Sequence, residues 1–588
     1  MLRDTIGRKG WLDKLFPFLS WRREINRDTL KADLTAGITV ALVAIPQSLA
    51  YAQLAGVPAY FGLYAILVPS LIGALFGSSR ILSTGPVAMT SLLTAASVIP
   101  FAHWGTEQFY TIVVQMAFLS GVVQIVLGMA RMGVLLNFLS QPVLMGFINA
   151  AAIIIGLSQL APLVGLSLRN SEHFLVDIAH ILANMDQMHL VSLIFGLSSL
   201  AVMLAVKRLA PKLPGVLIAV ILATIASYLI GFEAMGGRIV GVVPQGLPGF
   251  GLPTLDWKAS MELFPMAVVI ALVSFMEAMS SCKIIAIKTR TAWDENQELV
   301  GQGLAKIAAS FNHTMPVSGS FSRSALNLAA GARTGLSSIF TALAVLLTLL
   351  VLTPLLHHLP KPTLAAVIIL AVISLLNFRV FHEAWRASQQ DGIAAATTFV
   401  ATLLFAPNIQ YGMLIGIILA LSLFLFRTMK PRIVLLGLDE HGELQNADRF
   451  SLPRFHPKVV AIRFDGRLYF ANVSYFEECI LHLISSDPDI SYVLVDARGI
   501  NGLDASGAAM LRNLVTRLNG SGITLIFYNI KLPVLEVMQR TGLQDDIQQK
   551  NIFLSERDTL KDIKKRLEAE SSCENVQAGA VSESNVYQ

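Results

Sequence analysis

Charged side chains inside otherwise apolar stretches are the first candidates for chemistry in this sequence. Glu277 lies within ALVSFMEAMSSCK, Lys283 ends that stretch, and Arg323 lies in a later apolar region. A charge at the centre of a membrane-spanning helix costs about 2.5–3.5 kcal/mol, so such a residue usually faces a cavity or a charged partner and is functional. Glu277 is therefore suited to exchange a proton. The alternative is a structural ion pair with Lys283 or Arg323.

Arg323 belongs to a short segment rich in Ser and Gly, SGSFSRS at 318–324, which runs into the apolar residues 325–330. A segment of the same kind, STGPVA at 83–88, runs into residues 89–96. A helix N-terminus carries about half a positive charge and free N–H groups, which attract anions. Two short helices meeting at their N-termini, with a guanidinium beside them, would bind an anion halfway through a membrane. The alternative is close helix packing by small residues.

Four further residues have types that suit such a site. Gly85 lets the backbone approach a ligand closely, and Pro86 fits a first helical turn, where its missing N–H costs nothing. Gln47 and Tyr51 lie in an apolar stretch, IPQSLAY. They are suited to line the site, although a glutamine that bonds across helices and an interfacial tyrosine are the simpler interpretations.

The elements that would hold these residues are those of a membrane protein. The chain of 588 residues is 54% hydrophobic and 14% charged, against about 45–50% and about 25% in soluble proteins. Residues 1–31 are basic with interspersed aromatics, which indicates an interfacial segment, and residues 32–428 form a transmembrane domain. Basic residues flank that domain at both ends, so we expect cytoplasmic termini and an even number of spans, between twelve and fourteen.

Most of the apolar stretches reach the roughly 20 residues that a crossing helix needs. The two Ser/Gly-rich segments are too short, and each lies about 50 residues after a span begins, which indicates an inverted repeat with a binding site between its halves. The expected spans include Tyr110–Ala130, Val134–Leu160, Leu190–Val206, Gly215–Ile230, Phe264–Cys282, Ser337–Leu356, Leu364–Leu376, Ala394–Phe405 and Tyr411–Phe426.

A soluble α/β domain is predicted at 459–570, after a proline-containing linker at 429–458. Residues 571–588 lack periodicity and are expected to be disordered. The predicted strands are Val459–Phe464 and Leu468–Val473, joined by a hairpin turn at Asp465-Gly466, then Tyr492–Asp496 and Ile523–Tyr528, with helices at 475–485, 506–518 and 557–569.

Enzyme, cofactor and metal chemistry have little support in the sequence. The three cysteines, Cys282, Cys479 and Cys573, show no CxxC or Cys/His metal spacing, and no Gly-rich phosphate loop, HExxH or GxSxG motif is present. Asp504 and Ser506 precede a helix, where a cap is the simplest interpretation. The net charge of +5 reflects basic membrane flanks, so nucleic-acid binding is not indicated.

Several motifs, in order, resemble the sulfate permease (SulP) family, the prokaryotic and plant relatives of the solute carrier 26 anion transporters. The soluble motif VLVDARGINGLDASG at 493–507 resembles the STAS domain, shared by sulfate transporters and anti-sigma-factor antagonists. The membrane motifs are PQSLAYA at 46–52, VPAYFGLY at 57–64, FGSSR…STGPVA at 76–88, SFMEAMSSCK at 274–283, NQELVGQGLAK at 296–306 and PVSGSFSRSALNLAAGARTGLSS at 316–338.

The resemblance implies an all-α membrane domain of about fourteen segments in two inverted repeats of seven, divided into core and gate domains and assembled as a homodimer. It implies that the anion lies between the N-termini of segments three and ten. It places Glu277 where relatives carry an acidic residue tied to cation or proton coupling, and Ser506 where anti-sigma-factor antagonists are phosphorylated. The implied anion-site residues are Gln47, Tyr51, Gly85, Pro86, Val87, Phe321, Ser322 and Arg323.

The predicted function is secondary active uptake of a small anion, sulfate with protons, through the cell inner (plasma) membrane. Some sodium-coupled bicarbonate carriers of the family have aspartate at the position of Glu277, so the resemblance implies a proton rather than sodium here. Sodium- or proton-coupled transport of bicarbonate or a dicarboxylate, and anion exchange, use the same framework and remain alternatives. Two other classes remain: a sensor that binds an anion without turnover, and an enzyme or anti-sigma switch centred on the STAS domain.

Overall fold

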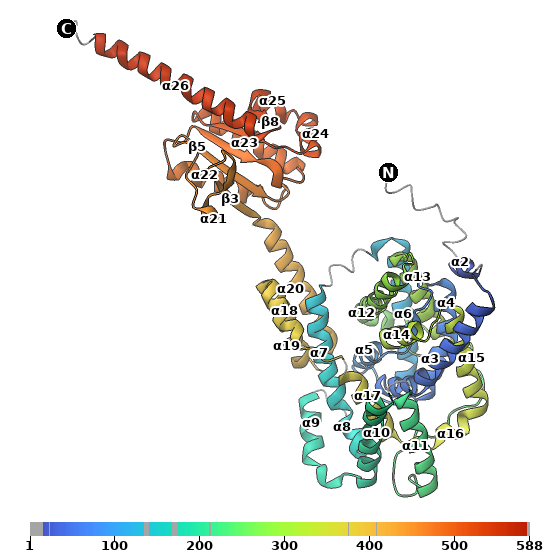
Figure 1. The fold of residues 1–588 in the computed structure, drawn as a ribbon. Helices are drawn as coiled ribbons and strands as arrows, with labels where there is room; N and C mark the ends of the chain where they lie inside the picture. The colour runs from blue at the N-terminus through green and yellow to red at the C-terminus, as the bar shows by residue number, and fades with distance from the viewer. Residues whose placement is uncertain are drawn as a thin grey trace. The chain divides into compact units, whose positions relative to one another are not determined.

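A computed structural model describes residues 16–22, 24–133, 140–166, 174–210, 213–373, 375–406 and 408–584. The chain divides into two compact units, Met1–Ala420 and Leu421–Gln588, which Figure 1 shows in blue to yellow and in orange to red. The first unit is helical except for two three-residue strands, and the second combines a sheet with helices. This division agrees with the predicted change from a membrane domain to an α/β domain.

The first unit contains the strands β1 (Ser83–Gly85) and β2 (Ser318–Ser320). Its helices are α2 (Phe18–Arg22), α3 (Arg27–Leu54), α4 (Tyr60–Phe76), α5 (Ala88–Val98), α6 (Glu107–Met129), α7 (Gln141–Ser158), α8 (Leu160–Val164), α9 (Phe174–Ala183), α10 (Leu190–Leu209), α11 (Gly215–Ile230), α12 (Trp257–Thr289), α13 (Glu295–Phe311), α14 (Phe321–Ala329), α15 (Leu336–Leu347), α16 (Thr353–His357), α17 (Lys361–Ile373), α18 (Arg379–Ala387), α19 (Gln389–Leu404) and α20 (Ile409–Met429), of which α20 continues past the boundary between the units.

Among the described residues, seven helices are long and apolar enough to cross a membrane. Four shorter apolar helices, α4, α5, α11 and α17, accompany them, so the count of fourteen crossings stays a prediction. The expected span Val134–Leu160 corresponds to α7, and its residues 134–139 lie outside the described part. The seven long helices are Arg27–Leu54, Glu107–Met129, Gln141–Val164, Leu190–Leu209, Trp257–Thr289, Leu336–His357 and Tyr411–Met429.

The helices of the first unit pack as two bundles. The first bundle contains α3, α4, α5, α6, α12, α13, α14 and α15, and the second contains α7, α8, α10, α11, α17, α18 and α19. The bundles meet mainly where α3 contacts α11 and α17, and where α5 contacts α7. Such an arrangement can move as two bodies, because fewer contacts join the bundles than hold each one together.

Glycines allow the first bundle to pack closely around α3. A Cβ atom at Gly62 of α4 would lie 1.9 Å from the Ser48 carbonyl oxygen of α3, and one at Gly37 would lie 2.5 Å from the Ser337 carbonyl oxygen. The start of α3 is also fixed to the chain before α15, because Asp33 accepts hydrogen bonds from the Arg333 and Thr334 N–H groups at 2.7 and 3.1 Å. Helix α3 is thereby held in the first bundle along much of its length.

The second unit is a six-stranded mixed sheet with strand order β4-β3-β5-β6-β7-β8. Strand β3 is antiparallel to β4 and β5, whereas β5, β6, β7 and β8 run parallel. The strands are β3 (Arg432–Leu438), β4 (Leu444–Asn446), β5 (Val459–Asp465), β6 (Tyr492–Asp496), β7 (Thr524–Tyr528) and β8 (Ile552–Phe553), and the helices are α21 (Ala447–Phe450), α22 (Val473–Ser486), α23 (Ala505–Gly520), α24 (Leu532–Arg540), α25 (Leu543–Ile547) and α26 (Glu556–Ser584).

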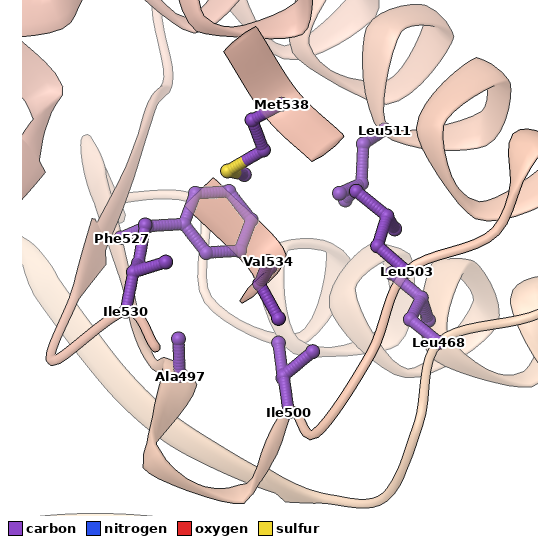
Figure 2. Close-up of a pocket in the computed structure, with 9 residues that line it drawn as sticks. All are labelled: Leu468, Ala497, Ile500, Leu503, Leu511, Phe527, Ile530, Val534 and Met538. Carbon is purple, nitrogen blue, oxygen red and sulfur yellow. The ribbon is translucent and has the colours of Figure 1, made fainter. Parts of the chain in front are cut away.

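Both faces of this sheet are covered, and alternate strand residues supply the two cores. On β5, Ile462 and Phe464 pack beneath α22 and α23, whereas Val459 and Ala461 pack beneath α26. The first core contains a cavity of about 10 Å³ whose labelled lining side chains, Leu468 and Phe527 among them, are all apolar (Figure 2). A cavity of that size holds one water at most and an apolar wall gives it no partner, so this void is a packing defect rather than a ligand site.

The predicted hairpin at Asp465-Gly466 is wrong. Residues 468–473 form no strand, because β5 already has β3 on one side and β6 on the other. The chain after β5 instead runs beside the segment before α23, where the Leu468 N–H donates to Gly502 O at 3.0 Å and the Asp504 N–H donates to Leu468 O at 3.2 Å. Leu468 is fully buried there, so its apolar character reflects core packing rather than a strand.

Two other boundaries differ from the sequence-based expectation. Strands β3 and β4 lie inside the predicted linker 429–458, because pairing with β5 makes them part of the sheet. Helix α26 continues to Ser584 through most of the tail that was expected to be disordered. The predicted helices at 475–485 and 506–518 and the strands at 492–496 and 523–528 are confirmed to within two residues at both ends. The helix predicted at 557–569 is confirmed at its start.

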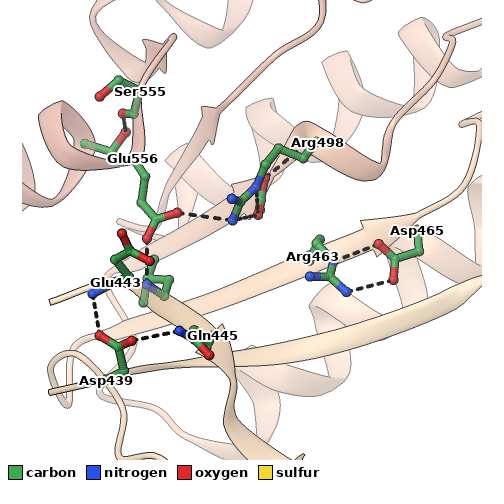
Figure 3. A network of polar contacts seen from close by, with 11 residues as sticks. Asp439, Glu443, Gln445, Arg463, Asp465, Arg498, Ser555 and Glu556 are labelled. Atoms are coloured by element: carbon green, nitrogen blue, oxygen red, sulfur yellow. Dashed lines mark hydrogen bonds and ion pairs between the residues drawn. The ribbon is translucent and has the colours of Figure 1, made fainter. Parts of the chain in front are cut away.

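Charged residues fasten the start of α26 to the sheet (Figure 3). The Glu556 carboxylate accepts from the Leu444 N–H at 2.6 Å and pairs with Arg498 at 3.1 Å, and Arg498 also pairs with the buried Asp496 at 2.6 Å. At the adjoining turn, the Asp439 carboxylate accepts a hydrogen bond from the Glu443 N–H. This bond is the main reason why the pKa of Asp439 is lowered. These contacts complete the packing of the domain and form no cleft.

Candidate anion site

The two Ser/Gly-rich segments lie side by side in the first bundle. Strands β1 and β2 pair antiparallel, with Ser83 opposite Ser320, Thr84 opposite Gly319 and Gly85 opposite Ser318. All six residues are buried. Residues more than two hundred positions apart therefore meet, as the interrupted segments of an inverted repeat predict. We call the paired strands β1 and β2 the crossing.

A short helix leaves this crossing in each direction, with its N-terminus at the crossing. Helix α5 begins after Val87, whose side chain caps none of the N–H groups of the first turn. Helix α14 begins after Ser320, whose Oγ accepts from the Arg323 N–H at 3.4 Å. The uncapped first turn of α5 offers N–H donors and the positive end of the helix dipole. The Thr90 and Ser91 hydroxyls in the same turn are buried and have no partner among the described residues.

Arg323 supplies a full positive charge at the crossing. Its side chain reaches from α14 across to the segment before α5, where Nη1 donates to the Pro86 carbonyl at 2.8 Å. The residue is 1% exposed, and its Nη2 has no hydrogen-bond partner in the described part of the chain. A Cβ atom at position 85 would lie 3.0 Å from that nitrogen, so Gly85 leaves room for it. A buried guanidinium with an unused donor is suited to bind an anion.

Two further predicted residues converge on Arg323. Tyr51 on α3 and Glu277 on α12 lie close enough to Arg323 to interact with it electrostatically. Gln47, one turn before Tyr51 on α3, is buried, and its Oε1 has no partner among the described residues. Three helices from different parts of the sequence therefore direct polar groups to the same region.

Phe321 and Ser322 are more exposed than the other residues of this group. Phe321 is 49% exposed and lines a cavity of about 300 Å³ between α12 and α14, together with Ser324 and Lys288. Ile285, another lining residue, packs with Ala36 in the first half of α3. The cavity therefore opens on the side of the first unit where α3 begins.

The structural ion pair considered for Glu277 is not formed among the described residues. No Lys or Arg nitrogen comes within ion-pair distance of its carboxylate, and Oε2 is buried without a hydrogen-bond partner. Lys283 is exposed. The carboxylate is instead influenced by Arg323 and by a residue that sequence analysis did not single out, Lys306.

Lys306 lies on α13 and is fully buried. Its Nζ donates to Gln124 Oε1 on α6 at 2.8 Å and to Ser274 Oγ on α12 at 2.6 Å. Ser274 lies one turn before Glu277, and its carbonyl accepts from the Ser318 hydroxyl of β2 at 2.7 Å. The signal in the sequence was the motif NQELVGQGLAK, but burial of its lysine becomes visible only in the packed bundle.

The same helix anchors β1. Gln302 donates to Thr84 Oγ1 at 3.0 Å and to the buried Glu298 at 3.0 Å, and Glu298 accepts from the Ser79 N–H at 2.8 Å. Ser70 of α4 donates to the Thr84 carbonyl at 2.7 Å. The crossing is thus fixed to α4, α12 and α13 by hydrogen bonds that leave the first turn of α5 open.

In the second unit, Ser506 is exposed in the first turn of α23. The adjacent Asp504 is the N-cap, and its Oδ1 accepts from the Gly507 N–H at 2.8 Å. The capping role proposed for this motif therefore falls to Asp504. The Ser506 hydroxyl remains accessible for modification.

Comparisons with known proteins agree with this architecture. The chain is 32% identical to a probable sulfate transporter 4.2 of Arabidopsis thaliana, over 94% of this chain and 84% of that protein. It is 30% identical to a probable sulfate transporter of Mycobacterium tuberculosis, over 94% of this chain and 98% of that protein. These relatives match across both units.

Solved structures resemble the fold. Murine solute carrier 26 family member A9, an anion transporter solved in the inward-facing state, matches with a TM-score of 0.87 at 23% identity over 96% of this chain and 98% of that chain. The transmembrane domain of the cyanobacterial bicarbonate transporter BicA matches with a TM-score of 0.56 at 22% identity over 67% of this chain and 98% of that chain. A STAS domain model matches residues 453–559, and the sulfate permease family model matches residues 30–398. This chain belongs to the sulfate permease family, whose members are anion transporters, and it carries a C-terminal STAS domain.

Proposed function

We propose that this protein takes up a small oxyanion, sulfate with protons, by secondary active transport through the plasma membrane. The observation that carries the proposal is the Arg323 guanidinium, buried with an unused donor beside the uncapped first turn of α5. A buried cation next to open N–H groups favours an anion of high charge density. The names of the curated relatives as sulfate transporters favour sulfate.

The sulfate would lie between Arg323 Nη2 and the first turn of α5, with Ser322 and the α14 N-terminus on its other side. Gly85, Pro86 and Val87 would shape the approach, while Gln47 and Tyr51 would close the site from α3. Phe321, which lines the cavity, would stand at its entrance. Each contact uses a group placed at the crossing or at its edge.

Access would alternate by movement of the first bundle against the second. The cavity opens on the side where α3 begins, and with cytoplasmic termini that side is inward. The carrier would return to the outside when the first bundle shifts against α7, α11 and α17. Two such chains would form a homodimer in the membrane, with the second unit serving in regulation and Ser506 as a candidate phosphorylation site.

The charges around the crossing support coupling to protons. Arg323 and Lys306 contribute two positive charges and ionised Glu277 one negative charge, which leaves one net positive charge. Protonation of Glu277 raises that to two, which matches a divalent anion. Lys306 already places an ammonium near Glu277 and occupies the oxygens of Gln124 and Ser274. A sodium ion would need such oxygen ligands, so the geometry favours a proton.

The proposal is tested by uptake into liposomes that contain the purified protein. Labelled sulfate, bicarbonate and a dicarboxylate are compared while proton and sodium gradients are varied separately. We expect sulfate accumulation driven by an inward proton gradient and unaffected by sodium. Uptake of bicarbonate driven by sodium, or exchange without either gradient, would contradict the coupling. Saturable sulfate binding without any flux would indicate a sensor.

A further inference from the structure

A cluster of metal-ligand side chains lies at the other end of the first unit. Glu233 follows α11, His357 ends α16, and His358 comes next in the chain. One ligand atom from each of the three side chains lies within 4.8 Å of the other two. The His357 Nε2 is 3.9 Å from Glu233 Oε2. In the part of the chain that the structure describes, these three side chains form the one group of three metal-ligand residues.

The segments that carry these side chains are already held together. The Val240 N–H donates to Leu359 O at 2.9 Å, the Gly241 N–H donates to His357 O at 3.2 Å, and the Lys361 N–H donates to Arg238 O at 2.9 Å. The His358 ring packs against Tyr228 with centroids 5.1 Å apart and lies 4.8 Å from the His357 ring. The ligands are therefore positioned before a metal arrives, which reduces the entropy lost on binding.

We propose that Glu233, His357 and His358 form a Zn²⁺ site. Two imidazole nitrogens and one carboxylate oxygen are ligands that zinc prefers, with a fourth tetrahedral position left for water. The histidines are half-buried and Glu233 is exposed, so a metal can enter from the aqueous phase. Hard cations such as Mg²⁺ and Ca²⁺ prefer oxygen ligands and fit this set poorly.

The site lies on the side of the first unit opposite the cavity. Asp33, near the start of α3, bonds to the chain just before α15, and the helix Leu336–His357 is long enough to cross a membrane. His357 is therefore at the far end. Under the proposed orientation the metal would bind from outside the cell.

A metal at this site would tie together two connections between the bundles. Residues 231–256 join α11 of the second bundle to α12 of the first, and residues 358–360 join α16, which follows α15 of the first bundle in the chain, to α17 of the second. If transport requires the bundles to shift against each other, a metal that links these connections opposes the shift. External zinc would then inhibit uptake. This inhibition rests on the proposed function, whereas zinc binding is independent of it.

Binding is measured on the purified, metal-free full-length protein by calorimetric titration with ZnCl₂, and by the visible absorption of tetrahedral Co²⁺. We expect one Zn²⁺ per chain that is displaced by neither Mg²⁺ nor Ca²⁺. His357→Ala, His358→Ala and Glu233→Gln should each weaken binding about tenfold or more, while His382→Ala, an exposed histidine on α18, should not. Equal binding by wild type and the His357→Ala/His358→Ala double variant would overturn the site.

Inhibition is measured separately in proteoliposomes with zinc added outside or inside. We expect external zinc to reduce uptake by wild type and His382→Ala, and to leave uptake by His357→Ala unchanged. Zinc that binds without slowing uptake would overturn the proposed locking of the bundles. Absence of sulfate flux in metal-free wild type would count against the proposed function, while the titration would still decide the metal site.

Discussion

We expect anion binding to depend most on Arg323. It is buried, one of its terminal nitrogens bonds to the Pro86 carbonyl, and the other has no hydrogen-bond partner among the described residues. A charge-assisted hydrogen bond contributes about 1.5–3 kcal/mol, so we expect Arg323→Gln to raise the dissociation constant for sulfate about 10- to 100-fold. Arg323→Lys should recover only part of this, because one ammonium cannot replace the planar fork.

The measurement is sulfate binding to the purified protein by calorimetry. Arg333→Lys is the control, because Arg333 is exposed and its recorded hydrogen bond to Asp33 is made by its backbone N–H. Equal affinities of wild type and Arg323→Gln would place the anion elsewhere.

We expect Glu277 to set the response of uptake to pH. Arg323 on α14 and Lys306 on α13 are the charged groups that act on it. Uptake by wild type should rise as the outer solution is acidified, because protonation of Glu277 removes a negative charge from the site. Glu277→Gln fixes the neutral form, so its uptake should no longer respond to a proton gradient, whereas Glu262→Gln, on an exposed face of α12, should behave as wild type. A Glu277→Gln protein with the wild-type pH profile would remove Glu277 from coupling.

We expect Lys306 to exclude sodium from the site. Replacing it by methionine frees Gln124 Oε1 and Ser274 Oγ near Glu277 and removes a positive charge. We expect Lys306→Met to lose stability, by about 1–3 kcal/mol for the unsatisfied Gln124 Oε1, because Ser274 Oγ still accepts from Gln124 Nε2. Its remaining uptake should become sensitive to sodium. Lys258→Met, at the exposed start of α12, is the matched control. A folded Lys306→Met protein that still ignores sodium would refute the idea that the ammonium excludes it.

Much of this site could be predicted from residue types alone. An arginine among small residues and a glutamate in an apolar helix are rare enough to be recognised. Lys306 could not be recognised, because a lysine four residues after Gln302 in an amphipathic segment is typical of a solvated helix face. The zinc-site residues Glu233 and His357 lie more than a hundred positions apart, and only the fold brings them together.

At the scale of elements, the close contact between α3 and α4 positions Gln47 and Tyr51. Gly62→Ala would place a methyl group 1.9 Å from the Ser48 carbonyl oxygen. Overpacking of this kind costs about 1–3 kcal/mol, so we expect a lower midpoint of thermal unfolding in detergent and weaker sulfate binding. Gly156→Ala on α7 is the control, because nothing lies within 4 Å of its added Cβ. Equal loss in both variants would show that the contact with the Ser48 carbonyl is not the cause.

The short helices α5 and α14 were predictable because their segments are too short and too polar to cross a membrane alone. Their pairing as β1 and β2 was not, because three-residue strands leave no periodic signal. The predicted hairpin after β5 failed for the opposite reason. Leu468 belongs to an apolar run whose tertiary role is burial beneath α23, and sequence alternation cannot show that both edges of β5 are occupied.

At the scale of the molecule, the two bundles explain why one crossing point can serve both sides of a membrane. The crossing is fixed within the first bundle, whereas its contacts with the second bundle are limited to a few helices. Under the proposed mechanism, anion binding and access are separate: the first bundle would hold the site, and its movement would determine which side the site faces.

The most direct test is a structure of the full-length protein in lipid with selenate, a heavier oxyanion of the same shape and charge as sulfate. We expect selenate density between Arg323 Nη2 and the first turn of α5, present in wild type and absent in Arg323→Gln. Density at another place, or an Arg323 side chain that extends into bulk water, would contradict it.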